Sequence, residues 1–136
     1  MIHEEICTYE VCKLARDKGF PQDECGVNIG YYAWDGCRNI HPLVSSFAWY
    51  DDEYNHDDLY LAPTQALLQR WLRAEKGIDI EITVVVAFDA FNGFHRQYDC
   101  QIKSPRKGEP IFVVGGLSTY ELALEEGLKY TLENLI

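Results

Sequence analysis

Long apolar runs are missing from this sequence. The longest apolar stretch, from Ile82 to Phe88, is far shorter than the ~20 residues that a membrane-spanning helix needs. The first residues, Met1 to Glu5, have neither the basic flank nor the apolar centre of a signal peptide. We therefore expect a soluble, cytoplasmic protein that does not engage a membrane.

Basic residues are scarce relative to acidic ones. Twelve lysines and arginines stand against 22 aspartates and glutamates, which gives a formal net charge of −10 at pH 7. The imbalance is concentrated in residues 1–63, which hold four basic and twelve acidic residues, whereas residues 64–136 hold eight and ten. Because nucleic-acid binding draws much of its affinity from neutralising phosphates, this charge disfavours DNA and RNA as partners.

Paired cysteine spacings are also absent. The chain has five cysteines, an odd number, and none of them forms a Cys-x-x-Cys pair: Cys7, Cys12, Cys25, Cys37 and Cys100. Zinc sites are recognised by such short paired spacings, and disulfide frameworks belong to exported chains. We expect free cysteines that behave as small buried apolar residues, and neither a metal site nor a cofactor.

Local signatures of catalysis are not found either. The four histidines have no recognisable motif around them, Ser45-Ser46 lacks the frame of a nucleophile elbow, and Gly115-Gly116 lacks the spacing of a phosphate loop. The acidic run Asp51 to Asp58 alternates in part like a calcium loop, but His56 and Ala62 stand where that loop needs glycine and glutamate. The sequence therefore favours a non-enzymatic protein with a solvated acidic loop, and leaves open whether the loop binds a cation.

The pattern of apolar residues is clearest in the second half of the chain. We predict a helix from Pro63 to Gly77, a strand from Ile78 to Phe88, a turn at Asn92-Gly93, and a second strand from Phe94 to Ile102. A short third strand, 111–114, precedes a last helix in which Ser118 and Glu121 form a capping box and Leu117 and Leu122 a hydrophobic staple.

These elements predict an α+β fold in which two helices cover one face of an antiparallel sheet. The side chains expected to pack together are those of the two helical stripes and of the strand face: Leu67, Leu68, Trp71, Leu124 and Leu128 against Ile80, Ile82 and Val84. A chain of 136 residues suits one domain, with residues 63–136 as an αβββα core and residues 1–62 as a helix plus an aromatic-rich acidic extension.

The first half is harder to interpret. A helix is expected from Thr8 to Lys18, ended by Gly19, and short strands at 31–34 and 44–50. Aromatic residues are dense in this part, and six of them form the candidate binding site: Tyr31, Tyr32, Trp34, Trp49, Tyr50 and Tyr54. The alternative is that these rings supply a local core, because the segment is short of aliphatic residues.

The segments Pro63 to Arg73 (PTQALLQRWLR) and Ser118 to Leu128 (STYELALEEGL), with Lys18-Gly19-Phe20, resemble a family of small uncharacterised proteins from gut bacteria and their phages. The resemblance implies a phage or mobile-element context and no catalytic residues, because no activity is known for that family. It favours an accessory protein that acts through contacts with a protein partner, which includes the possibility of a homo-oligomer.

The helix-strand-strand-strand-helix order also resembles the double-stranded RNA-binding domain. That domain carries a lysine-rich cluster at the start of its last helix, where this chain has Ser118 to Glu121 followed by two further glutamates. The matching surface would repel phosphate. An atypical nucleic-acid-binding module and a cryptic hydrolase remain the alternative functions.

Overall fold

The computed structural model describes residues 4–22, 29–32, 36, 38, 40–42 and 59–136. The chain divides into two compact units, residues 1–64 and residues 65–136. The division falls two residues from the boundary expected between the extension and the core. No helix among the described residues is both long enough and apolar enough to cross a membrane.

The N-terminal unit contains helix α1 (Tyr9–Asp17) and three short antiparallel strands, β1 (Ile29–Tyr32), β2 (Ile40–Pro42) and β3 (Leu59–Leu61), in the order β2-β1-β3. The Thr8 hydroxyl caps α1 by accepting from the Val11 N–H, 3.4 Å away. Gly19 ends the helix with φ of +96°, and the Phe20 N–H donates to the Ala15 carbonyl. The helix expected from Thr8 to Lys18 is confirmed, whereas β1 begins two residues before the strand expected at 31–34 and the strand expected at 44–50 lies outside the described residues.

The C-terminal unit has the predicted αβββα order: α2 (Gln65–Lys76), β4 (Asp79–Asp89), β5 (Gly93–Lys103), β6 (Ile111–Leu117) and α3 (Tyr120–Asn134). The strands form one antiparallel sheet in the order β4-β5-β6, and β4 and β5 pair along their whole length. The α+β class and the β4–β5 hairpin are confirmed. The third strand, expected at 111–114, extends to Leu117.

The core of this unit lies between α3, α2 and the helix-facing side of the sheet. Its buried side chains come from all three layers: Leu68, Leu72, Ile80, Cys100, Ile102, Leu124 and Leu128. Gly127 lets α3 approach the strands, because a Cβ there would lie 2.6 Å from Cys100 Sγ. The buried Gln65 links α2 to α3 by donating to the Glu121 carbonyl and the Glu125 carboxylate, at 2.9 and 2.7 Å.

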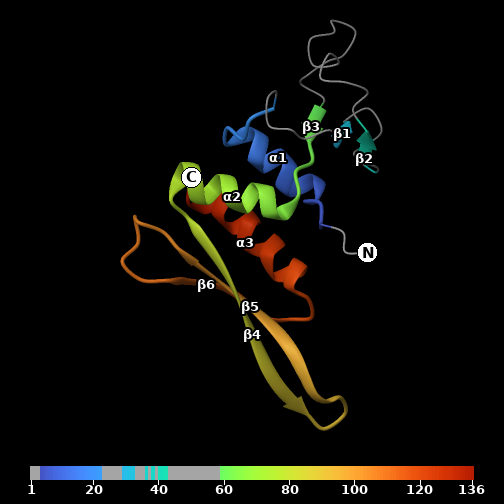
Figure 1. Cartoon of the computed structure of the whole chain (residues 1–136), viewed down its shortest axis with the longest axis vertical. Coiled ribbons are helices and arrows are strands. Elements are labelled where there is room, and N and C mark those ends of the chain that lie inside the picture. The colour runs from blue at the N-terminus through green and yellow to red at the C-terminus, as the bar shows by residue number, and fades with distance from the viewer. Residues whose placement is uncertain (1–3, 23–28, 33–35, 37, 39, 43–58) are drawn as a thin grey trace, which may run out of the picture. The chain divides into compact units, whose positions relative to one another are not determined.

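One packing expectation is wrong. Val84 is 51% exposed, and Leu67 and Trp71 are half-buried. The exposure of Val84 follows from a mismatch of lengths: eleven strand residues in β4 extend about 37 Å, whereas the fifteen residues of α3 extend about 22 Å. The hairpin therefore continues past the N-terminal end of α3, as Figure 1 shows.

The cap of α3 also differs from the prediction. The N-cap residue is Thr119, whose hydroxyl accepts from the Leu122 N–H at 3.1 Å, so the capping box assigned to Ser118 and Glu121 is wrong by one residue. Leu122 is 51% exposed and does not join the core as a staple. Ser118 and Thr119 both offer a capping hydroxyl, and the glutamate three residues after Ser118 favours Ser118 in the sequence, but the backbone conformation makes Thr119 the cap.

Candidate protein interaction surface

The distal half of the β4–β5 hairpin exposes a group of large apolar side chains. We call residues 82–98 the arm. Its exposed members include three phenylalanines at 67%, 96% and 79% of their full exposure, together with three valines: Phe88, Phe91, Phe94, Val84, Val85 and Val86. Such a concentration on one element is unusual, because soluble proteins seldom leave contiguous apolar patches open.

Strand register places most of these side chains on one face. Val84 lies opposite Tyr98, Val86 opposite Arg96, and Phe88 opposite Phe94. Side chains alternate between faces along a strand, so this face is the one that Ile80 and Ile102 present to the helices near the base. The apolar core face thus continues outward beyond the helices and becomes a solvent-exposed surface.

The tip of the arm is held by local hydrogen bonds. The Asp89 carboxylate accepts from the Phe91 and Asn92 N–H groups at 2.7 and 3.3 Å and from the Asn92 side-chain amide at 2.9 Å. These bonds, that from Phe91 foremost, hold the pKa of Asp89 below its usual value. Gly93 supplies the positive φ, +68°, that closes the turn. The Phe91 ring is therefore presented at the tip on an ordered turn.

The rings and charges of the arm suit an apolar contact. The Phe88 and Phe94 rings pack against each other with centroids 5.1 Å apart. Residues 82–98 contain one acidic residue, Asp89, and one basic residue, Arg96, whereas the whole chain carries −10. The arm is electrically balanced on a strongly acidic protein, so another molecule can approach it without facing the full charge of the chain.

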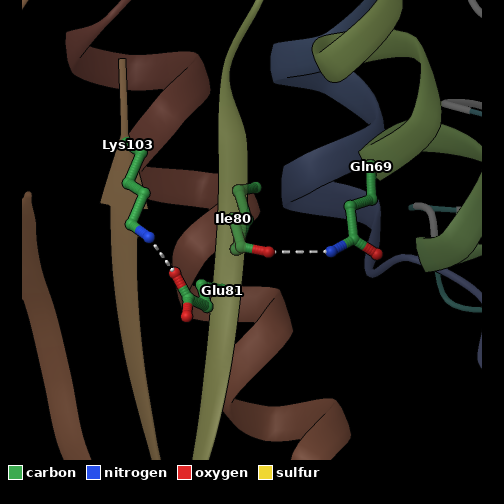
Figure 2. A network of polar contacts seen from close by, with 4 residues as sticks. All are labelled: Gln69, Ile80, Glu81 and Lys103. Carbon is green, nitrogen blue, oxygen red and sulfur yellow. Dashed lines mark hydrogen bonds and ion pairs between the residues drawn. The ribbon is translucent and has the colours of Figure 1, made fainter.

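The outer edge of β4 is open along the arm. At the base, Gln69 of α2 donates its side-chain amide to the Ile80 carbonyl at 3.0 Å, as Figure 2 shows, so this carbonyl points away from β5. Backbone groups alternate between the two sides of an antiparallel strand. Those of Ile82, Val84, Val86 and Phe88 therefore also point outward, where no described strand pairs with them.

The opposite edge of the sheet is irregular. The pairing of β5 with β6 shifts register twice, between Tyr98 and Cys100 and between Cys100 and Gln101. One Asp99 carboxylate oxygen accepts the Gly116 N–H at 2.9 Å, and Gly116 has a φ of +75°. Bulges of this kind protect an edge strand from pairing. The contrast leaves β4 as the long, regular edge of this sheet.

The aromatic residues singled out from the sequence have a different placement. Tyr31 is buried, its hydroxyl donates to the Cys7 carbonyl at 3.2 Å, and its ring meets that of Tyr9 edge-on at 5.9 Å. Tyr32 ends β1. The other four, Trp34, Trp49, Tyr50 and Tyr54, lie outside the described residues. The Tyr31 ring therefore packs inside the N-terminal unit.

Sequence reasoning missed the arm. Its signal was the length of the alternating segment, since β4 has eleven residues and an average strand has about five or six. A strand longer than the helices that cover it must leave part of its apolar face uncovered. The alternation by itself predicts a core-facing strand along its whole length.

Three of the five cysteines are described, and all three are buried, as expected: Cys7, Cys12 and Cys100. Burial, and secondarily the charge of Glu126, raises the pKa of Cys100 from 9.0 to about 11. The Cys12 thiol donates to the Cys7 carbonyl at 3.6 Å. Within the described ranges, no group of three or more metal-ligating side chains is close enough to hold an ion.

The basic loop after β5 lies beside the end of α2. A Cβ on Gly77 would lie 3.6 Å from the Pro105 ring, which brings the exposed Arg106 and Lys107 near the C-terminus of that helix. Lys103 forms an ion pair with Glu81 at 3.0 Å, drawn in Figure 2. These cations form the surface on which the nucleic-acid alternative depends.

Comparisons with known proteins give no relative: no family model, no curated protein and no solved structure matches this chain.

Proposed function

We propose that this chain is a non-enzymatic accessory protein that acts through protein contacts and docks through its arm. The observation that carries the proposal is the exposure of Val84, Val86, Phe88, Phe91 and Phe94 on one hairpin. Phenylalanine is favoured in the buried centre of protein interfaces. The resemblance of two helical segments to phage-associated proteins supports a phage or mobile-element setting, and the sequence features above support a cytoplasmic location.

The size of the patch fits part of a protein interface. An aromatic side chain can bury roughly 150–250 Å², so the three exposed phenylalanines of the arm offer on the order of 500 Å². This equals the largest patches on ordinary monomers and more than half of the ~800 Å² that each partner contributes to a standard interface. A patch of this size is large enough to form part of a contact surface.

The arm is also prepared for binding. Eleven paired positions between β4 and β5 and the hydrogen-bonded Asp89 turn fix the backbone before any partner arrives. Little conformational entropy is then lost on docking, which favours affinity. The arm is therefore an ordered contact surface, in contrast to a flexible binding loop.

The test is co-purification of tagged protein from its native host. We expect the double variant Phe88→Asp and Phe94→Asp to lose a protein that the wild type captures, because two charges would be buried at the interface. The matched control is Phe112→Asp, since Phe112 on β6 is 65% exposed but lies outside the arm. Equal capture by wild type and double variant, with folding verified by circular dichroism, would refute docking through the arm.

A further inference from the structure

We infer that the outer edge of β4 pairs with the same edge of a second copy of this chain, so that two arms join in one six-stranded sheet. The inference rests on the proposed function in one respect only: the joined arms form the face on which the protein partner docks. It adds the identity of the molecule that occupies the β4 edge.

The backbone N–H and C=O groups on the outer edge of β4 are best satisfied by another strand. The N–H and C=O groups of Ile82, Val84, Val86 and Phe88 point away from β5, as the direction of the Ile80 carbonyl requires. A side chain can satisfy one such carbonyl, as Gln69 does at Ile80. A row of four alternate residues is matched in spacing by another extended strand.

The position of Gln69 selects the register of that strand. Ile80 is already occupied, so pairing is confined to the segment from Ile82 to Phe88. Only one antiparallel self-pairing uses all four outward residues: Ile82 opposite Phe88 of the second copy, and Val84 opposite Val86 of the second copy. The two-fold axis then passes between the two Val85 residues, and about eight N–H···O bonds form.

Size is the first reason that the occupant is a second copy. Residues directly opposite each other in an antiparallel pair point to the same face of the sheet, so the exposed valines and phenylalanines of both arms lie side by side. The joined face offers on the order of 1,000 Å², whereas one arm offers about half of that and falls short of a standard ~800 Å² contribution. Dimerisation thus completes the surface that a single chain presents only in part.

Closure is the second reason. Same-edge pairing about a two-fold axis uses each β4 once and stops at two copies. The pairing of β6 with β5 is interrupted by two register shifts. Where β5 extends beyond the end of β6, only the backbone groups of Phe94 and Arg96 point outward. The sheet therefore has one edge that is long and regular enough to pair. The local charge balance of residues 82–98 lowers the repulsion that a net charge of −10 would otherwise bring to the contact, and Glu81, which this register places opposite Asp89 of the second copy, is paired with Lys103.

The first test measures the mass of the full chain in solution with one edge substitution. The Val86 N–H points outward, so Val86→Pro leaves the β4–β5 hydrogen bonds intact and removes a donor from the open edge. Val86→Thr keeps the donor and is the matched control. By sedimentation over a dilution series, we expect dimers for the wild type and for Val86→Thr, and monomers for Val86→Pro at the same concentrations.

The second test maps the register by disulfide trapping. Val85 faces its own copy across the axis at a spacing that a disulfide can bridge, whereas Ala87 faces Thr83 of the copy. Under mild oxidation, Val85→Cys should give a covalent dimer, and Ala87→Cys should give no more than the wild type, which controls for the native cysteines.

The outcomes separate this inference from the proposed function. A wild-type chain that stays monomeric at every concentration overturns the second copy, and so does a dimer that Val86→Pro leaves intact or that Ala87→Cys traps as well as Val85→Cys. Docking of another protein is measured independently by the Phe88 and Phe94 variant in the co-purification. Capture that persists in a monomer would sustain the proposed function alone.

Discussion

Gly127 is the residue at which α3 and the sheet come together. A Cβ at this position would lie 2.6 Å from Cys100 Sγ and 2.8 Å from Ile80 Cγ2, both closer than real side chains approach. Gly127→Ala would gain about 1 kcal/mol of helix propensity, but the overpacking of a closed core costs typically 1–3 kcal/mol. We expect a net loss in the free energy of unfolding by denaturant titration. Glu126→Ala, at an exposed position of the same helix, should change stability by much less, and a stabilising Gly127→Ala would contradict this packing.

Cys100 makes the stability of the fold sensitive to alkaline pH. Its thiol pKa is raised from 9.0 to about 11 in the folded state, chiefly by burial. Between these values the folded protein holds a proton that the unfolded chain has lost, so the free energy of unfolding falls as pH rises from about 9 to about 11. Other groups titrate in this range, so the measurement is the difference between wild type and Cys100→Ala. The variant should lose less stability over this interval, and parallel curves would refute the assignment.

Tyr31 illustrates what residue identity predicts and what it does not. The sequence allows this aromatic side chain either a place in a binding site or a place in a local core, and the shortage of aliphatic residues nearby favours the core. β1 pairs with β3, and the Cys7 N–H donates to the carbonyl of Pro63 just after β3, which together bring Tyr31 to the Cys7 carbonyl, 24 positions away. Long-range pairing of short strands leaves little periodic signal in the sequence.

Among the elements, α3 offers a test of a single terminus. Thr119 accepts from the Leu122 N–H, whereas Ser118 precedes the cap. Loss of an N-cap hydroxyl costs about 1 kcal/mol, with a range of roughly 0.5–2. We expect Thr119→Ala to lower the free energy of unfolding by about this amount and Ser118→Ala to leave it nearly unchanged. The reverse order of the two variants would restore the capping box expected from the sequence.

The helices and the hairpin of the C-terminal unit were predictable because each has a strong local period. Gly77 and Gly93 mark the end of α2 and the β4–β5 turn, and both adopt the positive φ that such positions require. The exposure of Val84 was not predictable in the same way. Alternation shows which residues share a face, but the extent of that face covered by α3 depends on where the helix starts in space.

On the scale of the whole molecule, charge and topology predict opposite partners. The net charge of −10 and the glutamates early in α3 oppose binding of a phosphate backbone, whereas the αβββα order resembles an RNA-binding module. We expect no association with duplex RNA or DNA at physiological salt beyond a dissociation constant of roughly 10⁻⁴ M. Submicromolar, salt-sensitive binding that is lost in the double variant Arg106→Glu and Lys107→Glu would replace the protein-contact proposal with the nucleic-acid alternative.

The candidate site itself was only partly predictable from the sequence. The expectation of a protein partner followed from acidity and from the absence of catalytic motifs, and it stays a prediction. The place of contact needed the structure, because Phe88 and Phe94 have the sequence pattern of core residues and become surface residues only where the helices end.

The central claim about the arm is that its open β4 edge pairs with a second copy, and amide hydrogen exchange of the purified chain at rising concentration tests it most directly. The amides of Thr83 and Val85 are bonded within the hairpin and should stay protected throughout, whereas those of Val84 and Val86 face outward and should become protected as the edge is occupied. We predict this alternating gain at Val84 and Val86, with no change at Phe112 on β6. Fast exchange at Val84 and Val86 at every concentration would contradict the account.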